Sequence, residues 1–270
     1  MTQIPSVLAP IATSVTSGKQ KRAAMKNWSA NNQGPNQFAV VQVATVGELH
    51  TELDCASLNW LSDCELARYQ SITSSNRKQQ FLAGHFLIRK MASRVFTNLP
   101  HDLTYYRDAQ NLRRLKCNMT AQPELYVSIS HSGDWIAAAV SHAPIGIDIE
   151  TFSKQRDFIA IANHVFSAAE ISCLESCCNE ELKETFYKYW TLKESAAKQY
   201  GVGLKFEISR SQSPVLVSGL DQAHLQTWQC QHYVIAVASK VSTQIETHGL
   251  NQSAKHQAWK NIRSSSCRIV

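Results

Sequence analysis

The spacing of apolar and polar residues along the chain predicts a mixture of helices and short strands. Over residues 76–95, apolar side chains such as Phe81, Leu82, Phe86 and Ile88 form a broad face with helical spacing. Shorter apolar runs between turn-forming residues are typical of strands. We expect helices over residues 61–73, 76–95, 168–176 and 181–200, and strands over residues 38–43, 125–129, 135–140, 145–149, 204–208, 215–217 and 233–238.

Helix boundaries can be read at two places. Ser-Ala-Ala-Glu at 167–170 is a capping box, in which the serine and glutamate side chains bond free backbone N–H groups at a helix start. The helix expected over residues 181–200 can close at Gly201. In each half of the chain a long helix precedes short strands, which suggests internal symmetry without a repeated sequence.

Composition then restricts the class of protein. The 270 residues are 44% hydrophobic and 18% charged, and no apolar run approaches the roughly 18 residues of a membrane span. We read no secretory signal, and the eight cysteines contain no C-x-x-C pair that would indicate zinc. These features favour a soluble, cytoplasmic protein with free thiols and no membrane partner.

The net charge of +6 is concentrated near the two ends of the chain. Residues 1–47 and 247–270 each hold four basic residues and no acidic residue, so the rest is slightly acidic. Because basic tails are usually solvated, we expect no nucleic-acid partner; a tail-driven nucleic-acid-binding module is the non-enzymatic alternative. We expect a flexible leader over residues 1–36 and a flexible tail over residues 246–270.

Two carboxylates lie in the apolar sequence Gly-Ile-Asp-Ile-Glu at 146–150. Side chains two apart in a strand share a face, so Asp148 and Glu150 should point the same way. Burying ionised carboxylates is costly unless something pairs with them. A solvated strand end would explain the pair without any site, and a metal site is the functional explanation.

A third carboxylate lies in the helix expected over residues 181–200. Glu194 shares a helix face with Lys198, one turn later, and these two alone could form a plain ion pair. If Glu194 converges on Asp148 and Glu150, a divalent cation is needed to offset the repulsion among them. Ligands that are all oxygen suit Mg²⁺ or Mn²⁺, which also bind phosphates.

The segment Ser-Ile-Ser-His-Ser-Gly-Asp at 128–134 links two expected strands through a turn. Backbone N–H groups there, the Ser130 hydroxyl and the His131 imidazole could together hold phosphate oxygens. Taken alone, His131 could equally be an ordinary turn residue.

These segments, in this order, resemble a known enzyme family. The chain is similar to 4'-phosphopantetheinyl transferases of the surfactin-synthetase-activating type. The resemblance rests on four segments in order: Ser-Ile-Ser-His-Ser-Gly-Asp at 128–134, Gly-Ile-Asp-Ile-Glu at 146–150, Trp-Thr-Leu-Lys-Glu-Ser-x-x-Lys at 190–198 and Gly-x-Gly-Leu at 201–204. The resemblance covers roughly residues 60–210. It implies transfer of the phosphopantetheine arm of coenzyme A to a serine of an apo acyl or peptidyl carrier protein, with adenosine 3',5'-bisphosphate as the second product.

The resemblance implies a Mg²⁺ site and the catalytic groups around it. Asp148, Glu150 and Glu194 match the family's metal-binding carboxylates. Either Glu194 or a metal-bound water aided by Asp148 would take the serine proton. Lys198 would contact the pyrophosphate and help the leaving group depart.

The resemblance also implies contacts to coenzyme A. Ser130 and His131 match the pair that contacts its phosphates, and Lys193 matches the motif lysine before the glutamate. Counting back from the Gly of Leu-Ala-Gly-His places Arg68 where the family has a basic residue for the 3'-phosphate.

Two features depart from the family pattern. The usual Gly-Lys-Pro or Gly-Arg-Pro before the Ser-His strand is absent, so we assign its charge to Arg113, with Arg114 or Lys116 as alternatives. His85 stands where Arg or Asp is common. Both departures concern binding of adenine and the 3'-phosphate and leave the metal site untouched.

The resemblance implies an α+β fold made of two similar half-domains, residues 37–143 and 144–245, with the active site between them. Each half would be a small, mostly antiparallel sheet packed on a long helix, and the protein a monomer. The carrier could belong to a fatty-acid, polyketide, polyunsaturated-fatty-acid or nonribosomal-peptide synthase. The rival enzyme is a Mg²⁺-dependent pyrophosphohydrolase of coenzyme A or a nucleotide, which needs the same carboxylates but no carrier.

Overall fold

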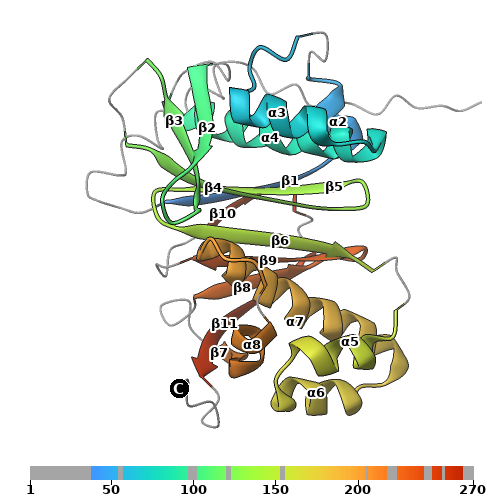
Figure 1. Cartoon of the computed structure of the whole chain (residues 1–270). Coiled ribbons are helices and arrows are strands. Elements are labelled where there is room, and N and C mark those ends of the chain that lie inside the picture. Colours follow the sequence, from blue (N-terminus) through green and yellow to red (C-terminus); the bar gives the residue numbers. More distant parts are fainter. Residues whose placement is uncertain are drawn as a thin grey trace, which may run out of the picture. The chain divides into compact units, whose positions relative to one another are not determined.

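Helices and sheets are stacked in layers in the part of the chain that the structure describes (Figure 1). The computed structural model describes residues 38–53, 57–96, 102–119, 123–152, 156–204, 206–217, 224–239, 245–250 and 253–263. The leader expected over residues 1–36 lies outside these ranges. None of the described helices is both long and apolar enough to cross a membrane.

Along the chain, the elements form two successive groups, in each of which a strand is followed by helices and then by further strands. The first group comprises β1 (Ala39–Thr45), α2 (Val46–His50), α3 (Asp63–Ser71), α4 (Ser75–Phe96), β2 (Leu103–Arg107), β3 (Arg113–Cys117), β4 (Leu125–Ser132) and β5 (Trp135–Ser141). The second comprises β6 (Ile145–Thr151), α5 (Phe158–Val165), α6 (Ala168–Glu175), α7 (Asn179–Gln199), α8 (Phe206–Ser211), β7 (Gln212–Val217), β8 (Leu225–Gln229), β9 (Tyr233–Ser239), β10 (Ile245–His248) and β11 (Lys255–Arg263).

The strands form two sheets, and the fold is α+β as the sequence indicates. One sheet has the order β10-β1-β5-β4-β3-β2 and the other β6-β9-β8-β11-β7. All neighbouring strands are antiparallel except β1 and β10. The expected division into half-domains at residues 143 and 144 falls just before β6, where the second sheet begins, and it stays a prediction.

Two kinds of apolar layer hold the sheets in place. Between the sheets, small and branched side chains of β1 and β5 pack on β6 and β9, with Val41, Ala139, Ile147 and Ile235 fully or almost fully buried. On the outer faces, α4 packs on the first sheet and α7 on the second (Figure 1). Side chains alternate across each strand, so a strand such as β4 can present different residues to these two layers.

Most expected helices and strands are present, with one change of type. The capping box is confirmed, because Ser167 accepts from the Glu170 N–H and the Glu170 carboxylate accepts from the Ser167 N–H at 2.7 Å. The strand expected over residues 204–208 is wrong, since helix α8 begins at Phe206. A short apolar run does not distinguish a strand from a helical turn. Helix α8 is joined to α7 by a hydrogen bond of 2.5 Å, which Nζ of Lys193 in α7 donates to the carbonyl of Ser209 in α8.

The expectation of a flexible tail after residue 246 is corrected for the described part of that segment. Strand β10 pairs with β1 in the first sheet, and β11 lies between β7 and β8 in the second. Trp259 is buried, and its indole N–H donates to Thr227 at 3.0 Å. Backbone pairing, on one side of β10 and on both sides of β11, holds this segment in place although its sequence has no apolar period.

Helix α7 lies close against β6 because Gly146 has no side chain. A Cβ added to Gly146 would lie 1.9 Å from the Ser195 carbonyl oxygen and 2.6 Å from the Gln199 nitrogen, both in the α7 backbone. No real Cβ fits at such distances, so glycine is required where the strand and helix meet. The first residue of the Gly-Ile-Asp-Ile-Glu segment therefore sets the spacing between β6 and α7.

We expect Gly146→Ala to destabilise the protein by about 3 kcal/mol or more, because α7 must move away from β6. Urea-induced unfolding followed by tryptophan fluorescence measures the change. The matched control is Gly203→Ala, since a Cβ there meets nothing within 4 Å. Equal stability of the two variants would contradict the close packing of α7 on β6.

Candidate active site

A row of serines on β4 joins the two sheets. Ser128, Ser130 and Ser132 are two residues apart and so share one face of the strand, which is directed at β6. Ser128 accepts from the N–H of Ile147, and Ser132 accepts from the N–H of Thr151, both at 3.1 Å. Because β6 is the edge of its sheet, these hydroxyls satisfy backbone donors that would otherwise be unpaired.

The same row of serines orients the carboxylates of β6. Ser130 donates to Asp148 Oδ1 at 2.7 Å, and Ser132 donates to Glu150 Oε2 at 2.8 Å. Lys198 of α7 donates to the same Asp148 oxygen at 2.6 Å and to the Ser130 hydroxyl at 3.0 Å. Asp148 is only 5% exposed, so it is a nearly buried carboxylate held by a hydroxyl and an ammonium.

Glu194 of α7 lies near enough to this group for its charges to act on it. Burial raises the pKa of Glu194, and the negative charges of Asp148 and, less strongly, Glu150 raise it further, whereas Lys198 lowers it. These interactions mean that all three predicted carboxylates and Lys198 act on one region. In that region the three carboxylates carry more negative charge than the single ammonium of Lys198 can balance.

A divalent cation fits the chemistry of these donors, although the carboxylates are not gathered into a closed cluster. Within the described ranges, no group of three or more His, Cys, Asp or Glu side chains is close enough to hold a metal ion. Asp148 Oδ2, however, is buried and has no hydrogen-bond partner among the described residues. A buried carboxylate oxygen without a partner is costly, and a cation would satisfy it.

A separate cavity of about 740 Å³ lies between helices α3 and α4 and strands β2 to β4. Four guanidinium groups line it, from Arg68, Arg77, Arg107 and Arg113. Arginine always carries its charge and presents several N–H donors, so this cavity suits a phosphate-bearing ligand. Two of the predicted ligand-binding residues, Arg68 and Arg113, are therefore found in the same cavity.

The predicted Ser130 and His131 pair is divided between the two faces of β4. Ser130 points to Asp148, whereas His131 lines the arginine-lined cavity. An Arg77 nitrogen lies 2.9 Å from Nε2 of His131. Arg77 was not identified from the sequence, because it lies in the polar first turn of α4, in no recognised motif.

The structure distinguishes among the three basic residues proposed for β3. Arg113 lines the cavity. Arg114, on the opposite face, binds Asp108 and stacks 3.8 Å from the ring centre of Tyr126. Lys116 is exposed and lies over the Tyr106 ring. The geometry therefore favours Arg113 as the residue that faces a ligand.

Lys193 has a different environment from the one its motif position implies. It is 7% exposed, and its ammonium lies 3.0 Å from Glu170 and donates to the Ser209 carbonyl. Burial lowers the pKa of Lys193, and the Glu170 charge opposes that effect. These contacts connect α6, α7 and α8, so they support a structural role for Lys193 rather than a contact with coenzyme A.

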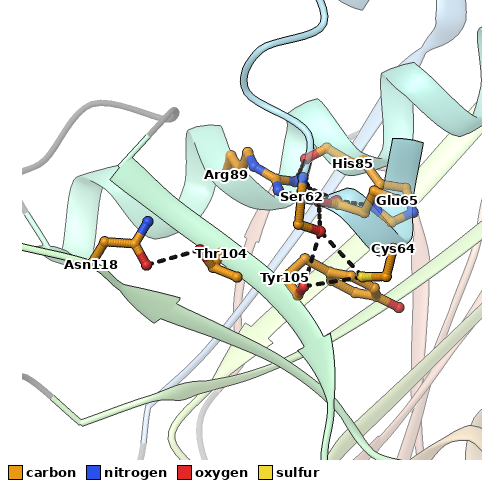
Figure 2. Close-up of polar contacts among 8 residues, drawn as sticks. All are labelled: Ser62, Cys64, Glu65, His85, Arg89, Thr104, Tyr105 and Asn118. Carbon is orange, nitrogen blue, oxygen red and sulfur yellow. Dashed lines mark hydrogen bonds and ion pairs between the residues drawn. The ribbon is translucent and has the colours of Figure 1, made fainter. Parts of the chain in front are cut away.

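A buried ion pair between Glu65 and Arg89 lies beside the arginine-lined cavity, which Glu65 and His85 help to line. Figure 2 shows the contacts of this pair. Both terminal nitrogens of Arg89 donate to the Glu65 carboxylate, at 2.7 and 2.6 Å, and Nδ1 of His85 lies 2.5 Å from Glu65 Oε1. Glu65 also accepts from Ser62 at the start of α3. Burial alone would raise the pKa of Glu65, but the hydrogen bonds from His85 and Arg89 and the Arg89 charge lower it to about 2.

Comparison with known proteins identifies the family. A model of the 4'-phosphopantetheinyl transferase superfamily matches residues 144–255. A 4'-phosphopantetheinyl transferase of Bacillus subtilis is 35% identical over 127 residues, which are 47% of this chain and 54% of that protein. The transferase AcpT of Salmonella typhimurium is 31% identical over 163 residues, 60% of this chain and 76% of that protein. The chain belongs to the 4'-phosphopantetheinyl transferase superfamily.

Coverage differs among these superfamily members. The transferase ffp of Bacillus subtilis is 40% identical over 160 residues, which are 55% of this chain and 69% of ffp. The first relatives are matched over about half of their length, between 52% and 55%. The superfamily resemblance inferred from the sequence motifs is confirmed.

We expect Glu65→Gln to destabilise the protein by about 3 kcal/mol near neutral pH, because Arg89 would lose its buried counter-charge. The pKa of Glu65 is lower in the folded state than its ordinary 4.5. Its stabilisation is therefore fully present above pH 4.5 and declines as the pH falls towards 2.

The difference in unfolding free energy between wild type and Glu65→Gln should accordingly shrink on acidification. Urea unfolding at pH 7, 5 and 3 measures it. Glu52→Gln is the matched control, because its pair with Lys90 is exposed and should contribute less than about 1 kcal/mol. A difference independent of pH would contradict an ionised Glu65 in the folded state.

Proposed function

We propose that this protein transfers the 4'-phosphopantetheine arm of coenzyme A to a serine of an apo carrier protein and releases adenosine 3',5'-bisphosphate. The main support, in a superfamily member, is the group around Asp148. Lys198 binds Asp148, and the charges of both act on Glu194 of the Trp-x-x-Lys-Glu helix. The nearby arginine-lined cavity supports a ligand with several phosphates.

The proposed reaction is a phosphoryl-type transfer in which the chain positions charge. The carrier serine oxygen bonds to the β-phosphorus, and the bond to the bridging oxygen breaks, with its electron pair leaving on adenosine 3',5'-bisphosphate. Lys198, beside Asp148, would supply positive charge to the leaving phosphate. The Glu194 carboxylate would accept the serine proton.

The carboxylates of β6 and α7 support Mg²⁺, or Mn²⁺, as the metal. Asp148, Glu150 and Glu194 would hold it, and the unpartnered Oδ2 of Asp148 is the atom that most needs a cation. When bound, such a cation supplies positive charge to pyrophosphate oxygens. Ser130 and Ser132 orient two of these carboxylates in advance, which limits the rearrangement that binding requires.

The carrier partner and the setting of the reaction are also inferred. The carrier would be a domain of a fatty-acid, polyketide, polyunsaturated-fatty-acid or nonribosomal-peptide synthase. Because β4, β6 and α7 of a single chain supply the group around Asp148, a monomer would suffice. Free thiols at Cys64, Cys117, Cys173, Cys177, Cys178 and Cys230 support a reducing compartment such as the cytoplasm.

The decisive experiment is the intact mass of apo carrier proteins after incubation with coenzyme A, Mg²⁺ and this protein. We expect a gain of one phosphopantetheine arm that a chelator abolishes. Release of adenosine 3',5'-bisphosphate without any carrier would instead favour the pyrophosphohydrolase. No gain on carriers from all four synthase types, with no bisphosphate release, would reject the transferase function.

In the same assay, Glu194→Gln and Asp148→Ala should each lower the transfer rate by about 100-fold or more, because each removes a charged group of the site. Glu181→Gln, an exposed acidic residue of the same helix, is the matched control and should transfer at the wild-type rate. Circular dichroism checks that each variant is folded. Near-normal transfer by either site variant would reject the role assigned to that residue.

Arg113→Ala should raise the KM for coenzyme A by about tenfold or more, because a charge-assisted hydrogen bond to phosphate is lost. Arg114→Ala, one residue along the strand, should leave the KM unchanged, since Asp108 and Tyr126 hold that side chain away from the cavity. Steady-state kinetics at saturating carrier measures both. The reverse result would show that Arg114 supplies the missing basic residue.

A further inference from the structure

One nitrogen of His85 is fixed by the protein and the other is available to a ligand. Nδ1 lies 2.5 Å from Glu65 Oε1, as Figure 2 shows. Nε2 has no hydrogen-bond partner among the described residues, and His85 lines the arginine-lined cavity. The residue is only 9% exposed, so its accessible edge is the one that borders the cavity.

The contacts of Glu65 determine which nitrogen of His85 carries the proton. Arg89 binds the Glu65 carboxylate through two nitrogens, which keeps that carboxylate ionised. An ionised carboxylate only accepts hydrogen bonds, so Nδ1 of His85 must be the donor. In a neutral imidazole, Nε2 is then an acceptor that faces the cavity.

The surroundings of His85 favour the neutral ring. The pKa of His85 is lowered, mainly by burial. The contact with Glu65 opposes this shift, and the charges of Arg89 and Arg113 add to it. The single negative charge of Glu65 is already balanced by Arg89, so a protonated His85 would add an uncompensated buried charge. Phe81 stacks on the imidazole at 4.1 Å between ring centres, and the Tyr105 ring lies nearly perpendicular to the imidazole at 4.8 Å between ring centres.

The cavity therefore offers a ligand two different kinds of contact. Its guanidinium groups only donate hydrogen bonds and suit phosphate oxygens, which only accept. The region around His85 is aromatic, with Phe81 and Tyr105, and it presents an acceptor. A flat heterocycle or sugar that donates a hydrogen bond matches this region, and a phosphate does not.

We propose that Nε2 of His85 accepts a hydrogen bond from the nucleoside part of the ligand and so contributes to nucleotide specificity. The donor would be the exocyclic amine of the base or the free ribose hydroxyl. The inference rests on the proposed function, because it assumes that coenzyme A is the ligand of the cavity. It assigns a specificity role to a residue that departs from the family pattern.

The test is isothermal titration calorimetry of the full chain with three probes. They are adenosine 3',5'-bisphosphate, its inosine analogue, which lacks the amine, and its 2'-deoxy analogue, which lacks the hydroxyl. The wild-type protein should bind one of the two analogues about tenfold more weakly, because one neutral hydrogen bond is lost. The analogue that binds weakly identifies the donor.

Two substitutions of His85 separate its two contacts. In His85→Asn the amide can still donate to Glu65 but cannot reach the position of Nε2, so the discrimination should fall to less than about twofold. In His85→Gln an amide oxygen can reach that position, so part of the discrimination should return. Thermal melting of each variant reports folding independently of ligand binding.

Equal affinity of the wild-type protein for all three probes would overturn the proposal without any variant. Full discrimination retained in a folded His85→Asn variant would do so too. Failure of the proposed function is a separate result. It would appear as absence of arm transfer together with absence of binding to any of the three bisphosphates.

Discussion

The contact between β4 and β6, the edge strand of the second sheet, determines where the candidate site can form. The edge strand needs acceptors for its outward N–H groups, and the serine hydroxyls of β4 supply them at Ile147 and Thr151. The serines lie on one face of β4, so His131 necessarily lies on the other. One strand thus connects the carboxylates of β6 with the arginine-lined cavity, and the register between the strands sets both.

Beside each sheet, a buried ion pair joins a short helix to the long helix that packs on that sheet. Glu65 at the start of α3 belongs to a capping box and binds Arg89 of α4, 24 residues later. Glu170 at the start of α6 likewise belongs to a capping box and binds Lys193 of α7. In both, a buried carboxylate fixes a short helix to the long helix on its sheet. This correspondence supports the proposed pair of half-domains better than any sequence repeat does.

The sequence predicts the long helices, the central strands and the shared face of Asp148 and Glu150, because these depend on local periodicity and spacing. That Glu194 belongs with them is implied by the family resemblance, since no local pattern places α7 beside β6. The sequence does not predict the hairpin of β2 and β3, whose strands are rich in polar residues, nor β8, β10 and β11. Strands β10 and β11 pair with strands distant in the sequence, which local periodicity does not reveal. The sequence also assigns Lys193 to the ligand, since a motif position does not reveal that Glu170 approaches from another helix. The regular spacing of Ser128, Ser130 and Ser132 is the signal that could have indicated the serine contacts with β6.

The placement of Lys193 explains how Glu194 is held. Adjacent residues on a helix point about 100° apart, so binding Lys193 to Glu170 fixes the rotation of α7 about its axis. Gly146 fixes the distance of α7 from β6. The rotation and the distance of α7 are both set by buried contacts. Before any ligand arrives, Lys198 therefore binds Asp148, and Glu194 lies near enough for the Asp148 charge to act on it. Such prior positioning is what electrostatic catalysis by the proposed transferase would require, and Lys193, Glu170 and Gly146, all outside the proposed reacting group, provide it.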